Sequence, residues 1–284
     1  MSVRIITDSA SDISQECARE WNITVLPLKI RFEEEEGKEY LDGMTITNEQ
    51  FYQKLIVEKK QPKTSQISPY DYETLFEEVK EAGDTAVYIA LSSKMSGSYQ
   101  SANLAAQGYE GIVHIVDSQE FCIGQRVLVE QAVRLRDAGR TAEEIAKAVE
   151  EERKNVRLIA VFDTLEYLKR GGRLSRGKAF VGTVLSLKPI ITITDGEVEV
   201  LDKVRGAKMG NQRMDAYLAE QGGLRFDRPY CLGYTGLSDE KLCQYIAGSK
   251  ALCGKSKEEL SVTHVGAVIG TYAGPGAIAV AFLV

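Results

Sequence analysis

Short segments rich in Ser and Thr follow several apolar runs, and their polar groups could bind an anion. Ser96 and Gly97 lie between an apolar run over 85–91 and an expected helix over 99–107. The first N–H groups of a helix lack intrahelical acceptors and carry a partial positive charge, so they favour an anionic ligand. Hydroxyl groups of Thr64 and Ser96 could add hydrogen bonds. This pattern indicates a carboxylate or phosphate site, although each Ser or Thr alone could equally cap a helix or a turn.

The same kind of segment recurs at the ends of other expected strands. In an open parallel sheet, the carboxyl ends of the strands line the ligand crevice. We therefore expect four polar segments to meet at one edge of a sheet: 7–9, 64–65, 92–98 and 117–118.

Signatures of catalysis are weak throughout the chain. There is no G-x-S-x-G segment, and His114 and His264 lie in apolar, strand-like runs, where a core histidine is the better interpretation. Residues 172–178 have the spacing of a P-loop, but Ala179 replaces its Ser or Thr and a helix is expected before it. Residues 274–279 match a dinucleotide pattern without the helix and acid that should follow. We expect no catalytic residue and no enzyme acting alone.

Composition excludes further classes of function. The formal charge of −6 disfavours a general nucleic-acid binder. Five cysteines without a C-x-x-C pair and only two histidines disfavour structural zinc, so no metal is expected, and free thiols in the cytoplasm are the better interpretation. No apolar run reaches the roughly 18 residues of a membrane-spanning helix.

One basic cluster stands out against the acidic composition. It consists of Lys169, Arg170, Arg173, Arg176 and Lys178. It is either a solvated loop or a local surface for a phosphate or an acidic partner, for which Arg supplies paired donors.

The order of expected elements predicts the fold class. Apolar runs over 3–7, 85–91 and 112–116 and a strand over 23–32 alternate with capped helices, as in a doubly wound parallel sheet. The capping signals are Thr47 with Gln50, Ser68 with Asp71, and Thr141 with Glu144. Later strands are expected over 158–162, 190–194, 197–201, 229–234 and 278–284, with a hairpin at Asp195-Gly196 and a helix over 239–252. We predict an α/β protein with a Rossmann-like parallel-sheet domain over 1–155 and an α/β domain with a mixed sheet over 156–284.

Seven short segments occur along the chain in this order: 7–9 (TDS), 63–66 (KTSQ), 91–102 (LSSKMSGSYQSA), 116–118 (VDS), 165–174 (LEYLKRGGRL), 187–189 (LKP) and 270–276 (GTYAGPG). Together they resemble the DegV family, whose members serve as the fatty-acid-binding subunit of bacterial fatty acid kinase. The resemblance covers essentially the whole chain.

The resemblance implies a lipid tunnel at the domain interface that holds a long-chain fatty acid such as palmitate, stearate or oleate, with no cofactor. It implies a separate ATP-dependent kinase subunit as partner, with at most transient membrane contact. The family usually has a histidine at the position of Tyr272, and tyrosine cannot carry a positive charge near neutral pH. The implied fatty-acid contacts are Thr64, Ser65, Ser93, Ser96, Gly97 and Tyr272. The implied contacts with the partner or a phosphate are Arg170, Arg173 and Arg205.

Two alternatives stay open at this point. Tyr272 favours a lipid sensor or carrier that has no kinase partner. A Ser-dependent hydrolase or a kinase that uses the Ser cluster or the basic loop is the enzymatic alternative.

Overall fold

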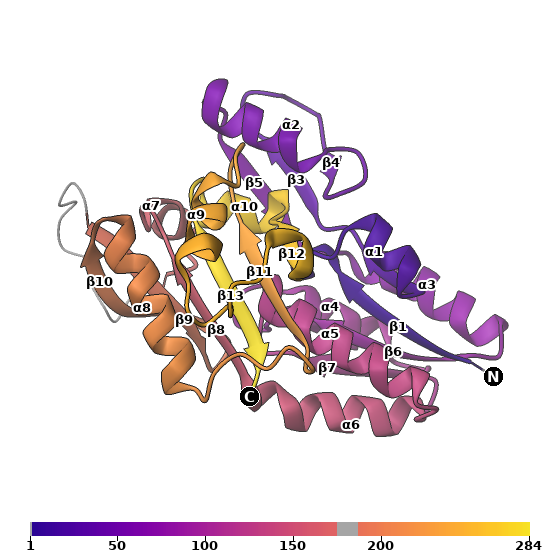
Figure 1. The fold of residues 1–284 in the computed structure, drawn as a ribbon. Coiled ribbons are helices and arrows are strands. Elements are labelled where there is room, and N and C mark those ends of the chain that lie inside the picture. The colour runs from indigo at the N-terminus through magenta and orange to yellow at the C-terminus, as the bar shows by residue number, and fades with distance from the viewer. Residues whose placement is uncertain (1, 175–186) are drawn as a thin grey trace.

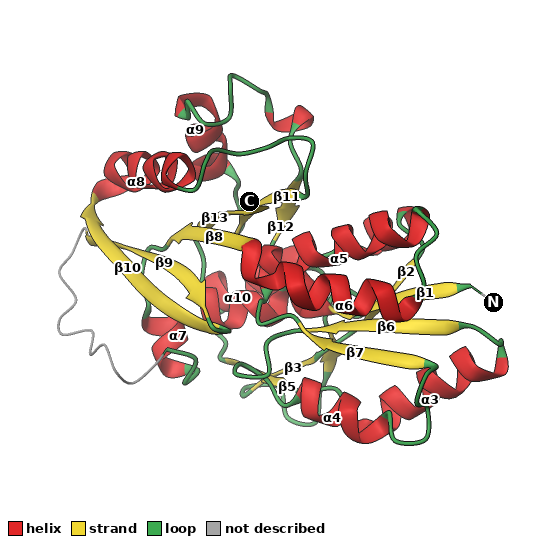
Figure 2. Cartoon of the chain, turned by 90° about the horizontal axis from the view of Figure 1, so that it is seen from below, coloured by secondary structure: helices red, strands yellow, loops and turns green. Residues whose placement is uncertain are grey.

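A four-stranded parallel sheet forms the first part of the computed structural model, which describes residues 2–174 and 187–284 (Figure 1). Helices cover both of its faces (Figure 2), which explains why residues 5–8 of β1 and 86–90 of β6 are all buried. This confirms the predicted doubly wound sheet. The strand order is β2 (Ile23–Leu26), β1 (Val3–Asp8), β6 (Thr85–Ala90) and β7 (Val113–Asp117). One face carries α5 (Cys122–Asp137) and α6 (Ala142–Glu152), and the other carries α3 (Pro69–Glu81) and α4 (Ser98–Ala105).

A small antiparallel sheet was not expected from the sequence. It contains β4 (Tyr40–Leu41), β3 (Lys29–Phe32) and β5 (Pro62–Ser65). The prediction of one strand over 23–32 is wrong, because Pro27 separates β2 from β3 and the two strands join different sheets. Proline has no N–H to donate to a ladder, so it is suited to such a break.

The capping signals place the helices around these sheets correctly. A helix α1 (Gln15–Glu20) follows β1, and the Thr47–Gln50 capping box starts α2 (Asn48–Tyr52), which continues as a π-helix over Gln53–Val57. Ser68 and Thr141 cap α3 and α6 through capping boxes, as predicted.

A six-stranded mixed sheet forms the second part of the fold, as predicted. Its order is β10 (Glu197–Arg205), β9 (Leu187–Thr194), β8 (Val156–Val161), β13 (Ile278–Leu283), β11 (Tyr230–Tyr234) and β12 (Val262–His264). Only β11 and β12 are parallel. Asp195 and Gly196 both have positive φ, 50° and 80°, as the predicted hairpin turn requires.

The helices of this second part differ more from expectation. The helix predicted over 239–252 is α9 (Glu240–Gly248), because Ser249 is extended and its hydroxyl donates to Asp215. Two helices, α8 (Gly206–Glu220) and α10 (Ala267–Ala273), were not predicted. A short helix, α7 (Glu166–Arg170), precedes the P-loop-like segment, in agreement with the argument against a P-loop.

Residues 3–117 supply all strands of the first two sheets, and residues 156–283 supply all described strands of the third. The division into 1–155 and 156–284 stays a prediction. The two parts are packed together, since α10 of the later part contacts β3, β5 and α2 of the earlier part. In the described ranges 2–174 and 187–284, no helix is long and apolar enough to cross a membrane.

Candidate functional site

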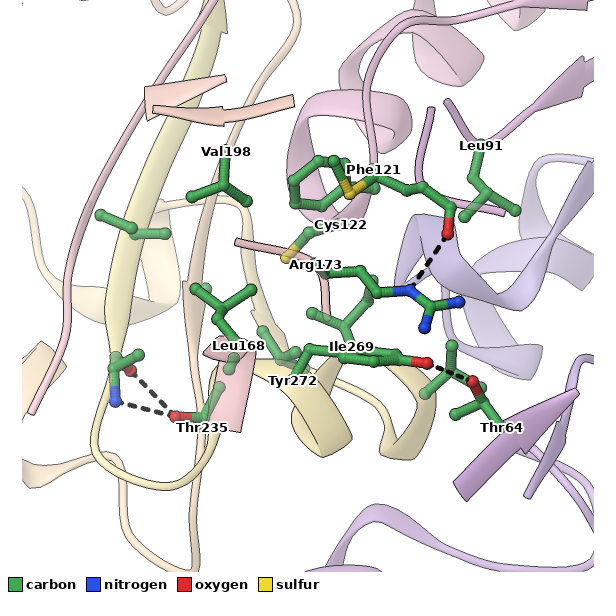
Figure 3. Close-up of a pocket in the computed structure, with 18 of the residues that line it drawn as sticks. Thr64, Leu91, Phe121, Cys122, Leu168, Arg173, Val198, Thr235, Ile269 and Tyr272 are labelled. Carbon is green, nitrogen blue, oxygen red and sulfur yellow. Dashed lines mark hydrogen bonds between the residues drawn. The ribbon is translucent and has the colours of Figure 1, made fainter. Parts of the chain in front are cut away.

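An apolar cavity of about 240 Å³ lies between the six-stranded sheet, β5 of the small sheet and the segments that follow β2 and β6 of the four-stranded sheet (Figure 3). A cavity of roughly 150 Å³ lined by Leu, Ile and Phe is already large enough to take up benzene. Its apolar wall comprises Leu28, Leu91, Met95, Phe121, Leu158, Ala160, Phe162, Leu168, Ile191, Val198, Val265, Val268, Ile269, Ala273, Ala277, Ile278 and Ala279. The cavity is therefore suited to a hydrocarbon group larger than benzene.

Strands of the six-stranded sheet form the part of this wall that the sequence did not reveal. The lining residues here are spaced two apart along the chain. They are Leu158 and Ala160 of β8 with Phe162 just beyond it, and Ala277 with Ala279 where the chain enters β13. Side chains at i and i+2 of a strand share a face, so this alternation marks one surface. The sequence carries that alternation, but both faces of these strands are apolar, which hides the cavity side.

The polar end of the cavity is closed by a hydrogen bond between β5 and α10. The hydroxyl oxygens of Thr64 and Tyr272 lie 2.6 Å apart. In Figure 3, Val198 and Thr235 lie on the opposite side of the cavity from Thr64. The cavity thus has one end with clustered polar groups and an apolar wall leading away from it.

Arg173 supplies the positive charge at this polar end. Its guanidinium carbon lies 4.9 Å from the centre of the Tyr272 ring, and its Nη1 donates to the carbonyl oxygen of Gly171 at 2.8 Å. A longer contact joins its Nε to the carbonyl oxygen of Met95 at 3.3 Å. The sequence placed Arg173 with a partner or a phosphate, whereas the structure places it in the wall of the cavity itself.

Ser96 and Gly97 approach the same end from the start of α4. The Ser96 hydroxyl accepts from the N–H of Ser98 and lies 3.0 Å from the hydroxyl of that residue. Gly97 packs directly on Gln66, since a Cβ on Gly97 would stand 2.0 Å from Oε1 of Gln66. Thr64, Ser65, Ser96, Gly97 and Tyr272 therefore all line the cavity.

A second, polar cavity of about 360 Å³ adjoins the first; we call it the polar chamber. Thr64, Arg173 and Tyr272 line both cavities, so they form the shared wall. The remaining lining residues of the chamber are Arg31, Glu33, Gln61, Pro62, Lys63, Tyr167, Arg170, Gly171 and Thr271. Four cations thus face one carboxylate, Glu33, which pairs with Lys63 at 2.6 Å.

Comparison with known proteins agrees with this geometry. A family model described as "Uncharacterised protein, DegV family" matches residues 2–284. A DegV domain-containing protein of Caldanaerobacter subterraneus subsp. tengcongensis is 38% identical over 286 residues, which cover 99% of this chain and 98% of the relative. The chain belongs to the DegV family.

Solved structures of DegV proteins have the same fold. One from Thermus thermophilus, described by its fatty acid binding, is 31% identical with a TM-score of 0.87, over the full length of both chains. A stearic-acid-binding protein from Eubacterium ventriosum is 26% identical with a TM-score of 0.85, over 100% of this chain and 98% of that one.

Two of the four strand-end segments of this DegV chain do not reach the cavity. Asp8 is fully buried, where its Oδ2 accepts from the Tyr88 hydroxyl at 2.8 Å and the Leu91 N–H at 2.9 Å. Burial raises the pKa of Asp8 to about 6. Ser93 is also displaced from its predicted role, because its hydroxyl donates to Asp117 and it does not line the cavity. These segments hold the loop that carries Ser96, through bonds from Asp8 to Leu91 and from Asp117 to Ser93, and do not line the cavity.

The basic cluster of this DegV chain is only partly at the site. Arg170 lines the polar chamber, stacks over Tyr167 at 5.4 Å and hydrogen-bonds Gln61. Arg205, at the end of β10, lines neither cavity. Arg176 and Lys178 lie outside the described residues.

The histidines do not form a catalytic pair with Ser96. His264 stacks between Tyr52 and Tyr234, its Nε2 lies 2.8 Å from the carbonyl oxygen of Gly236, and burial lowers its pKa. His114 lies on β7 and lines neither cavity. Across 2–174 and 187–284, no three His, Cys, Asp or Glu side chains are grouped to hold a metal ion.

Proposed function

We propose that this protein binds a long-chain fatty acid in the cytoplasm, with its carboxylate at the polar end and its tail in the apolar cavity. The observation that supports this most strongly is that the cavity has an apolar wall and that a cation and several hydroxyl groups lie together at one of its ends. The similar structures, a DegV family protein from Thermus thermophilus described by its fatty acid binding and a stearic-acid-binding protein from Eubacterium ventriosum, support the same ligand class.

The head-group contacts follow from the chemistry of a buried carboxylate. Such a group is stable away from water only when it is hydrogen-bonded or paired with a cation. Arg173 supplies the charge, and the hydroxyls of Thr64, Ser65, Ser96 and Tyr272, with the N–H groups around Gly97, supply donors. Charge-assisted hydrogen bonds of this kind are roughly twice as strong as neutral ones.

The tail supplies most of the binding free energy in this proposal. Each methylene buried contributes roughly 0.8 kcal/mol, so about fourteen of them contribute on the order of ten kcal/mol before the cost of association is subtracted. The polar end then fixes the direction in which the acid enters.

We further propose that an ATP-dependent kinase subunit docks at the polar chamber and places its bound ATP beside the carboxylate. Transfer of a phosphoryl group from ATP to a carboxylate oxygen would give an acyl phosphate and ADP. Arg31, Lys63, Arg170 and Arg173 surround the chamber that adjoins the carboxylate site. Arginine side chains suit phosphate recognition because they offer paired donors in a fixed geometry.

Mass spectrometry of lipid extracted from the purified protein tests the first part. We expect a bound fatty acid, and uptake of palmitate, stearate or oleate by delipidated protein at one molecule per chain. Repeated recovery of empty protein that takes up none of the three contradicts the proposal.

Incubation of the loaded protein with ATP and a cognate fatty acid kinase subunit tests the second part, with acyl phosphate as the product. A second candidate, a lipid carrier or sensor without a kinase partner, is favoured by Tyr272 in place of the usual histidine. That candidate is supported if the protein binds fatty acid, the bound acid is not phosphorylated, and the kinase subunit is not recovered in a pull-down.

A further inference from the structure

Helix α10 brings Tyr272 to the proposed head-group site, so the position of this helix decides where the Tyr272 hydroxyl lies. Tyr272 is the sixth residue of the seven in α10, and its hydroxyl reaches Thr64 on β5. The middle of the helix packs closely on α2. A Cβ on Gly270 would stand 2.7 Å from the Tyr52 hydroxyl oxygen and 2.8 Å from a ring carbon of Phe51.

Two buried carboxyl groups hold the start of α10. Oδ1 of Asp42 accepts from the N–H of Ala267 at 3.0 Å, and Oδ2 accepts from that of Val268 at 3.4 Å. Oδ1 of Asp12 accepts from the N–H of Gly266 at 2.7 Å. These are N–H groups that a helix cannot satisfy internally.

Asp42 is itself fixed beside the cavity. It follows β4, is only 3% exposed, and its N–H donates to the carbonyl oxygen of Leu28 at 3.0 Å. Leu28 lines the apolar cavity. Asp42 therefore ties the segment around the cavity wall to the first turn of the helix that carries Tyr272.

We propose that Asp42 is a positioning residue of the head-group site, which sets the place of the Tyr272 hydroxyl against Thr64 through α10. This inference rests on the proposed fatty acid site. It goes beyond that site because Asp42 lines neither cavity and would act only through the helix. Binding groups must be held within about 0.5 Å of their productive place, so a small shift of α10 is sufficient to weaken the site.

The test compares Asp42→Asn with Asp215→Asn at pH 8. Burial raises the pKa of Asp42 to about 6, so it is ionised at this pH. The two N–H groups of α10 are accepted by different oxygens of Asp42, and asparagine replaces one of these oxygens by an NH2 group, which cannot accept. Asp215 is a matched control, because its carboxylate also accepts from a backbone N–H, that of Lys250, and from two hydroxyls away from both cavities.

We expect Asp42→Asn to raise the dissociation constant for oleate about tenfold, and Asp215→Asn to change it less than about twofold. Tyr272→Phe should cost less in the Asp42→Asn background than in the wild type, because the hydroxyl is already misplaced there. Equal costs in both backgrounds, or unchanged binding by Asp42→Asn, overturn the proposal. If Asp42→Asn does not fold, Gly266→Ala replaces it. A Cβ there would meet Oδ1 of Asp12 at 3.1 Å and Oδ1 of Asp42 at 3.3 Å, so this variant disturbs both carboxyl groups that hold the start of α10.

A ligand-free measurement separates this proposal from the proposed function. The ¹³C signal of the Tyr272 ring, assigned with Tyr272→Phe, should shift in Asp42→Asn and not in Asp215→Asn. Failure of the wild type to bind any fatty acid sinks the proposed function, whereas an unshifted Tyr272 signal sinks the positioning role.

Discussion

The hydroxyl groups of Thr64 and Tyr272 lie 2.6 Å apart, although 208 residues separate them in the sequence. Both residues line the apolar cavity and the polar chamber, so their hydrogen bond is part of the wall between the two. A carboxylate bound at this wall would accept from one or both hydroxyls in place of the bond between them. The head group would then face the chamber while the tail stays in the cavity.

Replacement of Tyr272 by phenylalanine tests this arrangement directly. Tyr272→Phe keeps the ring that stacks with Arg173 and removes the hydroxyl. Binding in the wild type exchanges the neutral bond of this hydroxyl to Thr64 for a charge-assisted bond to the carboxylate, so the net loss is about 1 kcal/mol. We expect roughly fivefold weaker binding of oleate by calorimetry. Tyr70→Phe on the exposed start of α3 is the control. An unchanged affinity of Tyr272→Phe means that its hydroxyl does not contact the carboxylate.

Loss of the Arg173 charge should have a larger effect. Arg173→Met retains much of the side-chain stem but leaves a buried carboxylate without a cation, so we expect binding at least about tenfold weaker. Arg225→Met is the control, because Arg225 is exposed, pairs with Asp227 and lines neither cavity. If both variants bind oleate equally well, the carboxylate does not lie beside Arg173.

Substitutions at two alanines of β13 distinguish a side chain that blocks the cavity from one that overpacks the core. Ala279 lines the cavity, whereas Ala281, two residues later, is fully buried and does not line it. Ala279→Leu can extend into open space, so it should block uptake of long acyl chains with little change in thermal stability.

Ala281→Leu has no such space and should lower the free energy of unfolding by about 1–3 kcal/mol while oleate binding persists. The two variants are compared by thermal unfolding and by oleate uptake. Normal uptake by Ala279→Leu shows that the tail does not occupy this part of the cavity.

Local signals in the sequence predicted most of the fold. Capping boxes at Thr47, Ser68 and Thr141 start helices, and Asp195-Gly196 makes the expected hairpin, because each of these features depends only on neighbouring residues. The prediction of one strand over 23–32 failed because its two parts join different sheets. Pro27 marks the break locally, but it does not indicate that the chain then enters a second sheet.

The candidate site was predictable only where a motif marks it. Thr64 and Ser96 line the cavity as expected, but Ser93 does not, since its strand-end position also places it beside Asp117. Asp42 and the place of Arg173 depend on the packing of α10 against β5 and α7, which joins distant parts of the chain. Sequence spacing does not contain that information.

The pH dependence of stability should reveal the buried carboxyl groups. Burial, with repulsion from Asp42, raises the pKa of Asp12 from an ordinary value of 3.8 to about 7. The unfolded chain therefore releases this proton near pH 4 and the folded protein near pH 7. The free energy of unfolding should fall as pH rises between these values, because the unfolded state is the one that has lost the proton.

Asp12→Asn removes this titration at little steric cost. Asparagine tolerates the positive φ of 54° at this position and can still accept from the N–H of Gly266. A pKa difference of one corresponds to about 1.4 kcal/mol, so the rise from 3.8 to about 7 corresponds to about 4 kcal/mol at pH 8. Asparagine makes a weaker bond to the N–H of Gly266 than the carboxylate does, so we expect a smaller gain, on the order of 2 kcal/mol. Chemical unfolding of both proteins at pH 5 and pH 8 measures this gain in the free energy of unfolding. A variant less stable than the wild type at pH 8 would show that the Asp12 charge is stabilising.

Gly97 packs directly on Gln66 at the polar end of the cavity. A rescue experiment tests whether this contact shapes the site. The φ of −75° at Gly97 suits alanine, so the obstacle is the Gln66 side chain, 2.0 Å from the new Cβ. Gly97→Ala should displace Gln66, break its bond to Ser101 and weaken oleate binding several-fold. Gln66→Ala frees that space, so the double variant should bind more tightly than Gly97→Ala alone. If the second substitution restores nothing, the effect of Gly97→Ala comes from the backbone of the loop and not from Gln66.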